Sequence, residues 1–220
     1  MTDARHIIAR RCALELRDGE VVNLGIGIPT LAGNYIPAGL TVILHTENGA
    51  FGYGPKPATN AADSDITNAS GEPITLLPGA ALMDLATSLG AARNGYISTT
   101  VLGGLEVDQE GTLANWASRR NGKWWPGIGG AMDLCYGVPR VIAALQHVGK
   151  HGHSKVRKRT ELPPTGRHCV KVIVTDKAVF DVTATGLVLR EAYAGLDVAD
   201  IRAITEADFT VSPDFGPMRQ

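Results

Sequence analysis

The sequence predicts an α/β fold, an open sheet flanked by helices, in a single domain over residues 1–220. Short apolar runs typical of buried strands alternate with amphipathic stretches typical of helices, and this alternation favours a largely parallel sheet. The 26 glycines are the second indication, because several follow directly on an apolar run, where tight strand-to-loop junctions are needed. We find no linker, internal repeat or low-complexity segment that would divide the chain.

The bulk composition is that of an ordinary globular protein. Hydrophobic residues make up 44% of the chain and charged residues 20%, and the net charge of −1 favours neither nucleic acid nor a membrane as partner. Cys12, Cys135 and Cys169 are far apart and lack a Cys-x-x-Cys pair, so we expect no metal site. Residues 1–11 lack the apolar core of a signal peptide and no apolar run approaches a membrane span, so we expect a cytoplasmic location.

The first glycine-rich loop partly matches a dinucleotide-binding motif. Gly25 and Gly27 follow a strand expected over residues 21–24. Thr30 stands where that motif has its third glycine. Pro29 also removes an amide that a phosphate would need. We therefore expect a close-packed turn or a loop lining another ligand rather than a nicotinamide or flavin site.

The stretch from Thr46 to Gly54, with Glu47 near its start, is the strongest candidate for a functional loop. It follows an apolar run over residues 40–44 that is typical of a buried parallel strand. Open α/β sheets place ligand chemistry at the carboxyl ends of such strands. Glu47 is therefore the main candidate for a reactive carboxylate. The alternative is a glutamate that accepts hydrogen bonds from loop amides or pairs with a nearby lysine or arginine.

The remaining elements follow from hydrophobic periodicity and turn residues. Helices are expected over residues 2–17, 31–35, 79–92 and 198–205, and strands over 74–77, 97–102, 138–146, 170–175, 178–182 and 187–191. Residues 105–116 predict a hairpin around the turn at 108–111. Residues 209–220 are expected to be a loose tail, since the segment is rich in proline and polar residues.

A second glycine-dense loop runs from Gly127 to Asp133. Gly129 and Gly130 precede an expected helix start, where free backbone amides can bind an anion or an oxyanion. A tight structural turn is the alternative interpretation.

Two charged stretches have more ordinary explanations. Glu106, Asp108 and Glu110 could form a carboxylate cluster, but turn chemistry explains them without a metal. Residues 147–159 combine three histidines with five lysines and arginines. The sequence favours a solvated basic loop there, with contact to phosphates of an anionic ligand or a His-x-His metal site as alternatives.

Taken together, four stretches resemble the β subunit of the family I 3-oxoacid CoA-transferases. They are Asn23-Leu24-Gly25-Ile26-Gly27-Ile28-Pro29-Thr30, Glu47-Asn48-Gly49, Leu102 to Asp108 with Leu113 to Trp116, and Pro126 to Asp133. Thr175 to Phe180 and Gly186 to Glu191 agree as well, and the resemblance covers residues 5–209. It implies a CoA-transferase-type fold and an enzyme.

The resemblance also implies roles for particular residues. Glu47 would be the nucleophile that forms a glutamyl-CoA thioester in a ping-pong mechanism, and an amide of Gly129 or Gly130 would stabilise an oxyanion. The residues expected to bind substrate or CoA are Gly25, Gly27, Asn48, Gly49, Phe51, Tyr53, Gly103 and Gly104. Phe51 and Tyr53 would either exclude water from the reaction or simply pack the loop.

The expected partners are an α subunit on a separate chain, in an α2β2 heterotetramer, and small-molecule acids with CoA as the substrate carrier. No permanently bound cofactor is expected. Succinyl-CoA and acetoacetate, the substrates of ketone body metabolism, are the default pair. The alternatives are a 3-oxoadipate CoA-transferase subunit, an acyl-CoA hydrolase on the same scaffold, and a non-catalytic CoA-binding subunit. Thr46, Phe51 and Tyr53 depart from the common family pattern, which leaves the acyl substrate open.

Overall fold

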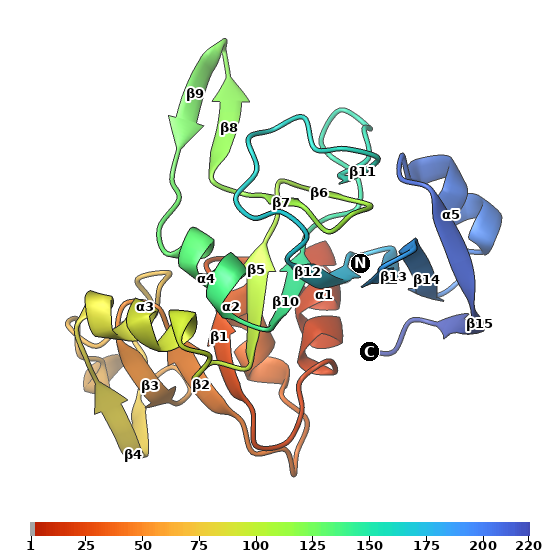
Figure 1. Cartoon of the computed structure of the whole chain (residues 1–220). Helices are drawn as coiled ribbons and strands as arrows, with labels where there is room; N and C mark the ends of the chain where they lie inside the picture. Colours follow the sequence, from red (N-terminus) through yellow and green to blue (C-terminus); the bar gives the residue numbers. More distant parts are fainter. Residues whose placement is uncertain (1–2) are drawn as a thin grey trace.

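A mixed sheet of ten strands crosses the protein in the computed structural model, which describes residues 3–220 (Figure 1). Five adjacent strands at its centre are parallel and run in the order β12-β10-β5-β1-β2. Their bounds are Val21–Leu24 for β1, Ile43–Thr46 for β2, Thr99–Gly103 for β5, Arg140–Ala144 for β10 and Val170–Val174 for β12. The predicted α/β class is confirmed.

Short antiparallel segments extend both sides of this parallel block. On one side, β3 (Ala50–Tyr53) and β4 (Leu76–Leu82) follow β2. On the other side, β13 (Ala178–Thr183) and β14 (Gly186–Ala192) form a hairpin, and β15 (Phe209–Pro217) adds parallel to β14 as the last strand. The sheet therefore ends at β4 and at β15.

Helices cover both faces of the sheet. α1 (Ala4–Ala13) and α2 (Ile28–Ala32) contribute buried residues to one hydrophobic cluster. α3 (Leu85–Arg93), α4 (Ala131–Gly137) and α5 (Val198–Ile204) contribute to the other. Side-chain caps explain several helix starts, since Asp3, Asp84 and Asp197 each accept a hydrogen bond from a backbone N–H of the first turn. Two short 3₁₀ helices, Gly33–Tyr35 and Thr59–Ala61, complete the helical elements of the described chain.

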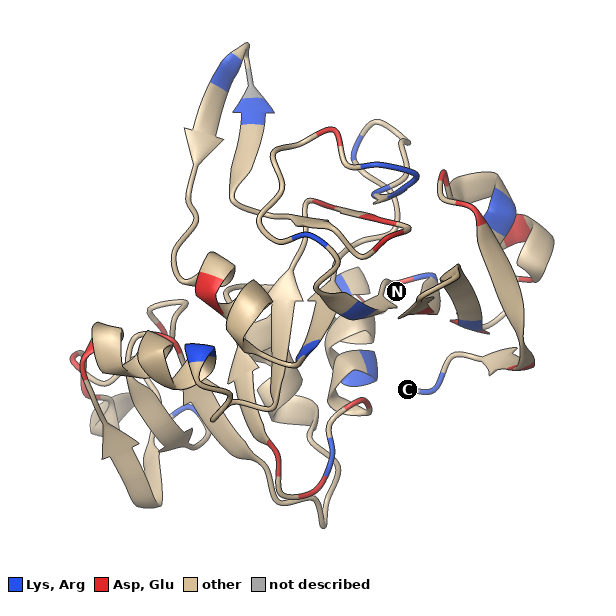
Figure 2. Ribbon diagram, viewed as in Figure 1, with Lys and Arg blue, Asp and Glu red and all other residues tan. Residues whose placement is uncertain are grey.

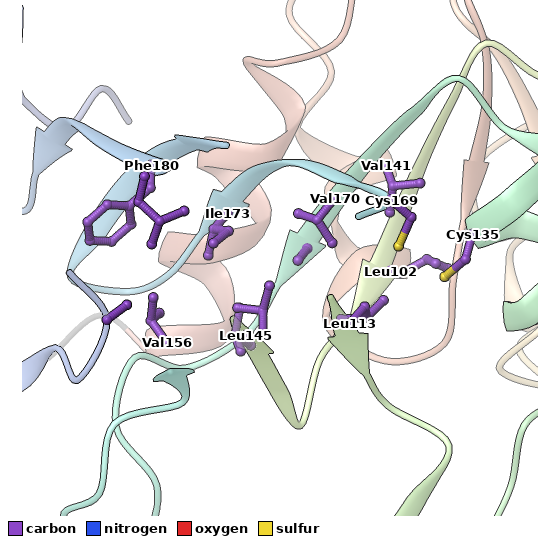
Figure 3. Close-up of a cluster of buried hydrophobic side chains, with 14 of the residues drawn as sticks. Leu102, Leu113, Cys135, Val141, Leu145, Val156, Cys169, Val170, Ile173 and Phe180 are labelled. Carbon is purple, nitrogen blue, oxygen red and sulfur yellow. The ribbon is translucent and has the colours of Figure 1, made fainter. Parts of the chain in front are cut away.

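The central strands are largely buried on both faces, which explains why their sequences are mostly apolar. In β10, Val141 and Ala143 belong to one cluster, whereas Ile142 and Ala144 belong to the other. Figure 3 shows the first cluster, in which Val141 and Leu145 lie near Val170 and Ile173 of the next strand. A two-residue repeat therefore distributes the apolar side chains between the two layers of helices.

Two small sheets stand beyond the carboxyl ends of the parallel strands. One combines β6 (Glu106–Asp108), β7 (Leu113–Ala114) and β11 (Val156–Arg157). The other is a hairpin of β8 (Ala117–Arg120) and β9 (Lys123–Pro126) that projects from the body of the protein (Figure 1). The predicted hairpin over residues 105–116 is confirmed, with β6 pairing antiparallel to β7.

A buried ion-pair network ties α1 to the strands around β14. Arg11 is fully buried and contacts Glu191 at 2.6 Å and Glu15 at 2.8 Å. Glu15 also pairs with Arg140 at 2.6 Å and with Arg190. Breaking such a buried pair leaves an uncompensated charge, so this network fixes how the first helix sits on the sheet.

Three sequence predictions are wrong, two of them on element boundaries. The tail at residues 209–220 is not loose, because residues 209–217 form β15 and both Phe209 and Met218 are buried. The helix expected over residues 79–92 begins only at Leu85, because β4 runs on to Leu82.

The third concerns the basic stretch over residues 147–159, which is not simply solvated. His147 is fully buried between Thr175 and Thr205, whose hydroxyls lie 2.9 and 3.0 Å from its ring nitrogens. Arg157 is buried and pairs with Glu161 and Glu206. Composition alone could not reveal that these partners come from other segments of the chain.

Candidate active site

A cavity of about 410 Å³ opens at the carboxyl ends of the parallel strands. The loops after β1, β5 and β10 line it, and the glycine-rich loop before α4 closes one side. In the sheet, β2 lies on one side of β1 and β5 lies on the other, so the order of strands reverses at β1. Such a reversal of strand order leaves a crevice where open α/β sheets bind ligands. Glu47 lines this cavity.

The backbone around Glu47 is a tight turn that joins β2 to β3. The N–H of Gly49 donates to the carbonyl of Thr46 at 2.9 Å, and the N–H of Met83 donates to the carbonyl of Gly49 at 2.9 Å. Gly49 has φ +125°, and a Cβ there would lie 2.0 Å from the Met83 oxygen. Only glycine fits this position, so the close approach of the Met83 segment fixes the turn that presents Glu47.

The carboxylate of Glu47 contacts the loop before α4. The N–H of Gly130 donates to Oε1 of Glu47 at 3.3 Å. A Cβ on Gly129 would lie 3.0 Å from Oε1, and one on Gly130 would lie 3.1 Å from Oε2. The absence of side chains at these two positions therefore allows the backbone to approach the carboxylate closely.

Burial changes the electrostatics of Glu47. Desolvation raises the pKa of this carboxyl above its usual value, the Gly130 hydrogen bond acts in the opposite direction, and the charge of Asp133 adds to the rise. A partly dehydrated carboxylate keeps less of its hydration shell and is therefore a better nucleophile than a solvated one. A carboxylate in this setting can act as a nucleophile, and it also accepts a hydrogen bond from a loop amide, as the alternative interpretation expected.

A chain of buried polar groups lies beneath Glu47. Thr100 of β5 donates its hydroxyl to Oδ1 of Asn23 at 2.8 Å, and Nδ2 of Asn23 lies 3.1 Å from Nδ1 of His45. Nε2 of His45 lies 2.8 Å from the hydroxyl of Ser88 in α3. Burial lowers the pKa of His45 to about 4, so the ring is neutral, and the Asn23 donor assigns the remaining proton to Nε2. These contacts connect β2, which leads into Glu47, to β1, β5 and α3.

The structure brings together part of the set predicted from the sequence. Gly25, Gly103, Gly104 and Gly129 line the same cavity as Glu47, and Gly130 hydrogen-bonds to it.

The other predicted residues lie elsewhere. Asn48 accepts from the Thr46 hydroxyl at 2.6 Å and donates to the Thr67 carbonyl at 2.9 Å, which makes it part of the turn. Gly27 donates its N–H to the Ser70 hydroxyl at 3.3 Å.

Neither aromatic residue of the Glu47 stretch is among the cavity-lining residues. Phe51 packs on the His45 ring, with centroids 4.3 Å apart. Tyr53 is buried and lines a separate cavity of about 300 Å³. These positions agree with the packing alternative for the two side chains.

Several cavity residues escaped the sequence reasoning. Asn115 donates to the Gly103 carbonyl at 3.0 Å and accepts from the Thr165 hydroxyl at 2.7 Å, so it braces the loop after β5. Gln146 and Lys155 come from the end of β10 and the stretch that was expected to be solvated. Gln146 and Lys155 meet at the cavity because residues after β10 pair with the segment before β11. No local sequence pattern predicts this pairing.

Two acidic residues of the β6–β7 hairpin accept hydrogen bonds from the backbone, but only Asp108 does so within the turn, as turn chemistry predicted. Glu106 accepts from the N–H groups of Glu161 and Leu162, and Asp108 accepts from those of Glu110 and Thr112. Over residues 3–220 no group of three or more His, Cys, Asp or Glu side chains is placed to hold a metal ion. No helix in this range is long and apolar enough to cross a membrane.

Comparison with known proteins defines the class. The coenzyme A transferase family model matches residues 5–203, so the chain belongs to the coenzyme A transferase family of enzymes. The chain is 47% identical over 217 residues to the beta subunit of the acetate CoA-transferase of Escherichia coli K12, covering 99% of this chain and 98% of that protein.

Two further comparisons agree. The chain is 45% identical over 212 residues to one subunit of the probable succinyl-CoA:3-ketoacid coenzyme A transferase of Bacillus subtilis, covering 96% of this chain and 97% of that protein. The crystal structure of the acyl-CoA transferase YdiF from E. coli O157:H7 superposes with a TM-score of 0.75 at 22% identity, over 99% of this chain and 43% of that one. The resemblance found in the sequence is confirmed.

Proposed function

We propose that this chain is the β subunit of an enzyme that moves CoA from succinyl-CoA to a 3-oxoacid such as acetoacetate. The position of the Glu47 carboxylate against the Gly130 amide, inside a partly apolar cavity, is the observation that carries the proposal. The relatives are named for acetate and for succinyl-CoA with a 3-ketoacid, and all of these acids are small enough for the cavity.

The chemistry proceeds through a carboxylate relay. Glu47 attacks the thioester carbonyl of the donor and expels the CoA thiolate, which leaves a mixed anhydride between the donor acid and Glu47. The thiolate then attacks the anhydride at the Glu47 carbonyl, the donor carboxylate leaves, and a glutamyl-CoA thioester remains. The acceptor acid repeats these steps in reverse order and leaves as its CoA thioester, so the Glu47 carboxylate is regenerated.

The Gly130 amide has a specific task in this sequence of steps. It lies against an oxygen of Glu47, and that oxygen becomes an oxyanion when the thiolate attacks the Glu47 carbonyl. Preorganised donors at such a position contribute about 100- to 1000-fold in rate. A separate oxyanion forms on the acyl carbon of the donor thioester when Glu47 attacks it. The hydrogen-bond donor for that oxyanion would come from the α subunit.

The partner would be an α subunit on a separate chain, in an α2β2 assembly. Both bacterial relatives are named as one subunit of a CoA-transferase, and this chain covers nearly all of each. CoA would act as the carrier of the acyl group rather than as a permanently bound cofactor.

The test is a covalent adduct. The complex of this chain with its α partner is incubated with succinyl-CoA and analysed by peptide mass spectrometry. A CoA adduct is expected on the peptide that contains Glu47, and Glu47→Gln should lose both the adduct and the transfer reaction while remaining folded. Glu110→Gln, which changes an exposed glutamate on the β6–β7 turn, is the matched control.

Retained transfer in Glu47→Gln would refute the nucleophile assignment. A thioester that is consumed equally fast without an acceptor acid would identify an acyl-CoA hydrolase instead. A folded complex that forms no adduct with any acyl-CoA would identify a non-catalytic chain that only binds CoA.

A further inference from the structure

Among the described residues, two with charged side chains line the Glu47 cavity, namely Glu47 itself and Lys155. Glu47 follows β2, and Lys155 lies beyond β10, three strands away across the carboxyl edge of the sheet. Neighbouring strands are about 4.8 Å apart, so the ends of β2 and β10 are separated by roughly 14 Å.

The backbone holds Lys155 firmly in place. Its N–H donates to the His147 carbonyl at 2.9 Å, and its carbonyl accepts from the N–H of Val107 at 3.0 Å. His147 in turn is fully buried, so the segment that carries Lys155 is anchored to the core. The position of the Lys155 backbone at the cavity is therefore fixed by these contacts.

No ion pair within residues 3–220 involves Lys155. The nearby carboxylates have other partners. Asp176 accepts from the N–H of His147 and pairs with Lys177, and Glu106 accepts from two backbone N–H groups. Figure 2 shows many blue and red segments on the loops around β11 and few on the helices near the cavity. Among the described residues that line the cavity, Lys155 is thus the one cation, and no carboxylate is paired with it.

Burial makes Lys155 suited to that use. Desolvation lowers the pKa of its ammonium, while the charges of Asp176 and Glu106 act to raise it and so favour the protonated form. A partly dehydrated cation gains more from an incoming anion than a solvated one does, because less water must be removed on binding.

The wall between the two charges is apolar. Leu102, Leu105 and Leu145 line the cavity between the loop of Glu47 and Lys155. Methylene groups of a short chain would lie against these leucines, while a polar end would meet the ammonium. A four-carbon acyl group with a carboxylate at its far end has both features.

We infer that Lys155 is the specificity-determining residue that binds the distal carboxylate of a dicarboxylic acyl group, such as succinyl, while its thioester carbonyl faces Glu47. This inference rests on the proposed function. Lys155 would distinguish succinyl-CoA from thioesters of monocarboxylic acids of equal length, because those have no anion at the far end to reach it. When such a thioester binds, the half-buried ammonium would stay without an anion, which disfavours the complex.

The experiment measures single-turnover formation of the Glu47 adduct by the complex with its α partner, with no acceptor acid present. Succinyl-CoA is compared with butyryl-CoA, which has the same number of acyl carbons and no distal carboxylate. Lys155→Met should lower the rate constant with succinyl-CoA about 10- to 100-fold more than that with butyryl-CoA. Lys155→Arg should restore part of the preference, because it keeps the positive charge.

Lys171→Met, which removes an exposed lysine of β12, is the matched control and should keep the wild-type ratio. Denaturant unfolding checks that each variant is folded, and Lys155→Gln replaces Lys155→Met if the latter is not. An unchanged succinyl-to-butyryl ratio in a folded Lys155 variant would overturn the inference, and so would an equal loss with both donors, which would assign Lys155 to the CoA moiety. If the wild-type complex forms no adduct with either donor, the proposed function itself fails, and the inference fails with it.

Discussion

Replacing Gly130 by alanine tests whether the amide next to Glu47 contributes to catalysis. The new Cβ would lie 3.1 Å from Oε2 and 3.3 Å from Cδ of Glu47, so the carboxylate must retreat by a few tenths of an ångström. The hydrogen bond from the Gly130 N–H is already 3.3 Å long and would be lost on that movement. Because removing one oxyanion donor costs about 100- to 1000-fold, we expect kcat to fall about 100-fold.

The cost to the fold should be much smaller. The same Cβ would lie 2.7 Å from Cδ2 of Leu89, which is the end of a flexible side chain that can rotate away. Overpacking of this kind typically costs about 1 to 3 kcal/mol, and the free end of the leucine places Gly130→Ala near the lower limit. The variant should therefore still unfold cooperatively in urea.

Steady-state kinetics of the complex and urea unfolding of the chain, measured on the same preparations, separate the two effects. KM for succinyl-CoA should change less than kcat, because the Gly130 amide acts on charge that develops during the reaction. A folded Gly130→Ala enzyme whose kcat stays close to that of wild type would refute the assignment. If Gly130→Ala lowers kcat and also abolishes cooperative unfolding, the loop has only a structural role as a turn.

Three further outcomes are expected. Because burial raises the pKa of Glu47, adduct formation should decline on the acid side at a pH above that of an ordinary glutamate. Glu47→Gln should be more stable than wild type by an amount that grows as the pH rises from the pKa of an unfolded glutamate to the raised pKa of Glu47 and is constant above it; a pH-independent stability difference would contradict this. Arg11→Met should lower the free energy of unfolding by about 3 to 5 kcal/mol in urea titrations, since Glu191 and Glu15 lose a buried partner, and a loss below about 1 kcal/mol would show that the network relaxes. Gly90→Ala in α3 should raise the urea midpoint, with a gain of about 0.5 to 1 kcal/mol, because its Cβ would meet only the end of Arg93 at 4.0 Å, and any destabilisation would count against that geometry.

The sequence was informative about the fold wherever an element is local. β1 coincides with its predicted range, and the β6–β7 hairpin follows from its turn residues. The sequence was misleading where a tertiary contact decides the structure. The polar, proline-containing segment from Phe209 becomes a strand only because β14 offers it an unpaired edge. β4 replaces the start of a predicted helix for the same reason, since β3 pairs with it.

The site was predictable to a similar degree. Glu47 and the glycines around the cavity could be found because a carboxylate after a buried strand and paired glycines before a helix have a physical meaning within the sequence. Lys155 could not, since its position depends on contacts with His147 and Val107 that no local pattern announces. Phe51 is near Glu47 in the chain, but its ring packs on His45 and does not line the cavity, as the packing alternative expected.

The buried contact between Arg11 and Glu191 has a consequence for the order in which the protein matures on the ribosome. The two residues are 180 positions apart, so at about 5 to 20 residues per second the arginine is synthesised roughly 10 to 40 s before its partner. During that interval Arg11 has only Glu15 of its two carboxylate partners, so its burial is less favourable than in the finished protein. We therefore expect the first helix to complete its docking only after β14 has emerged.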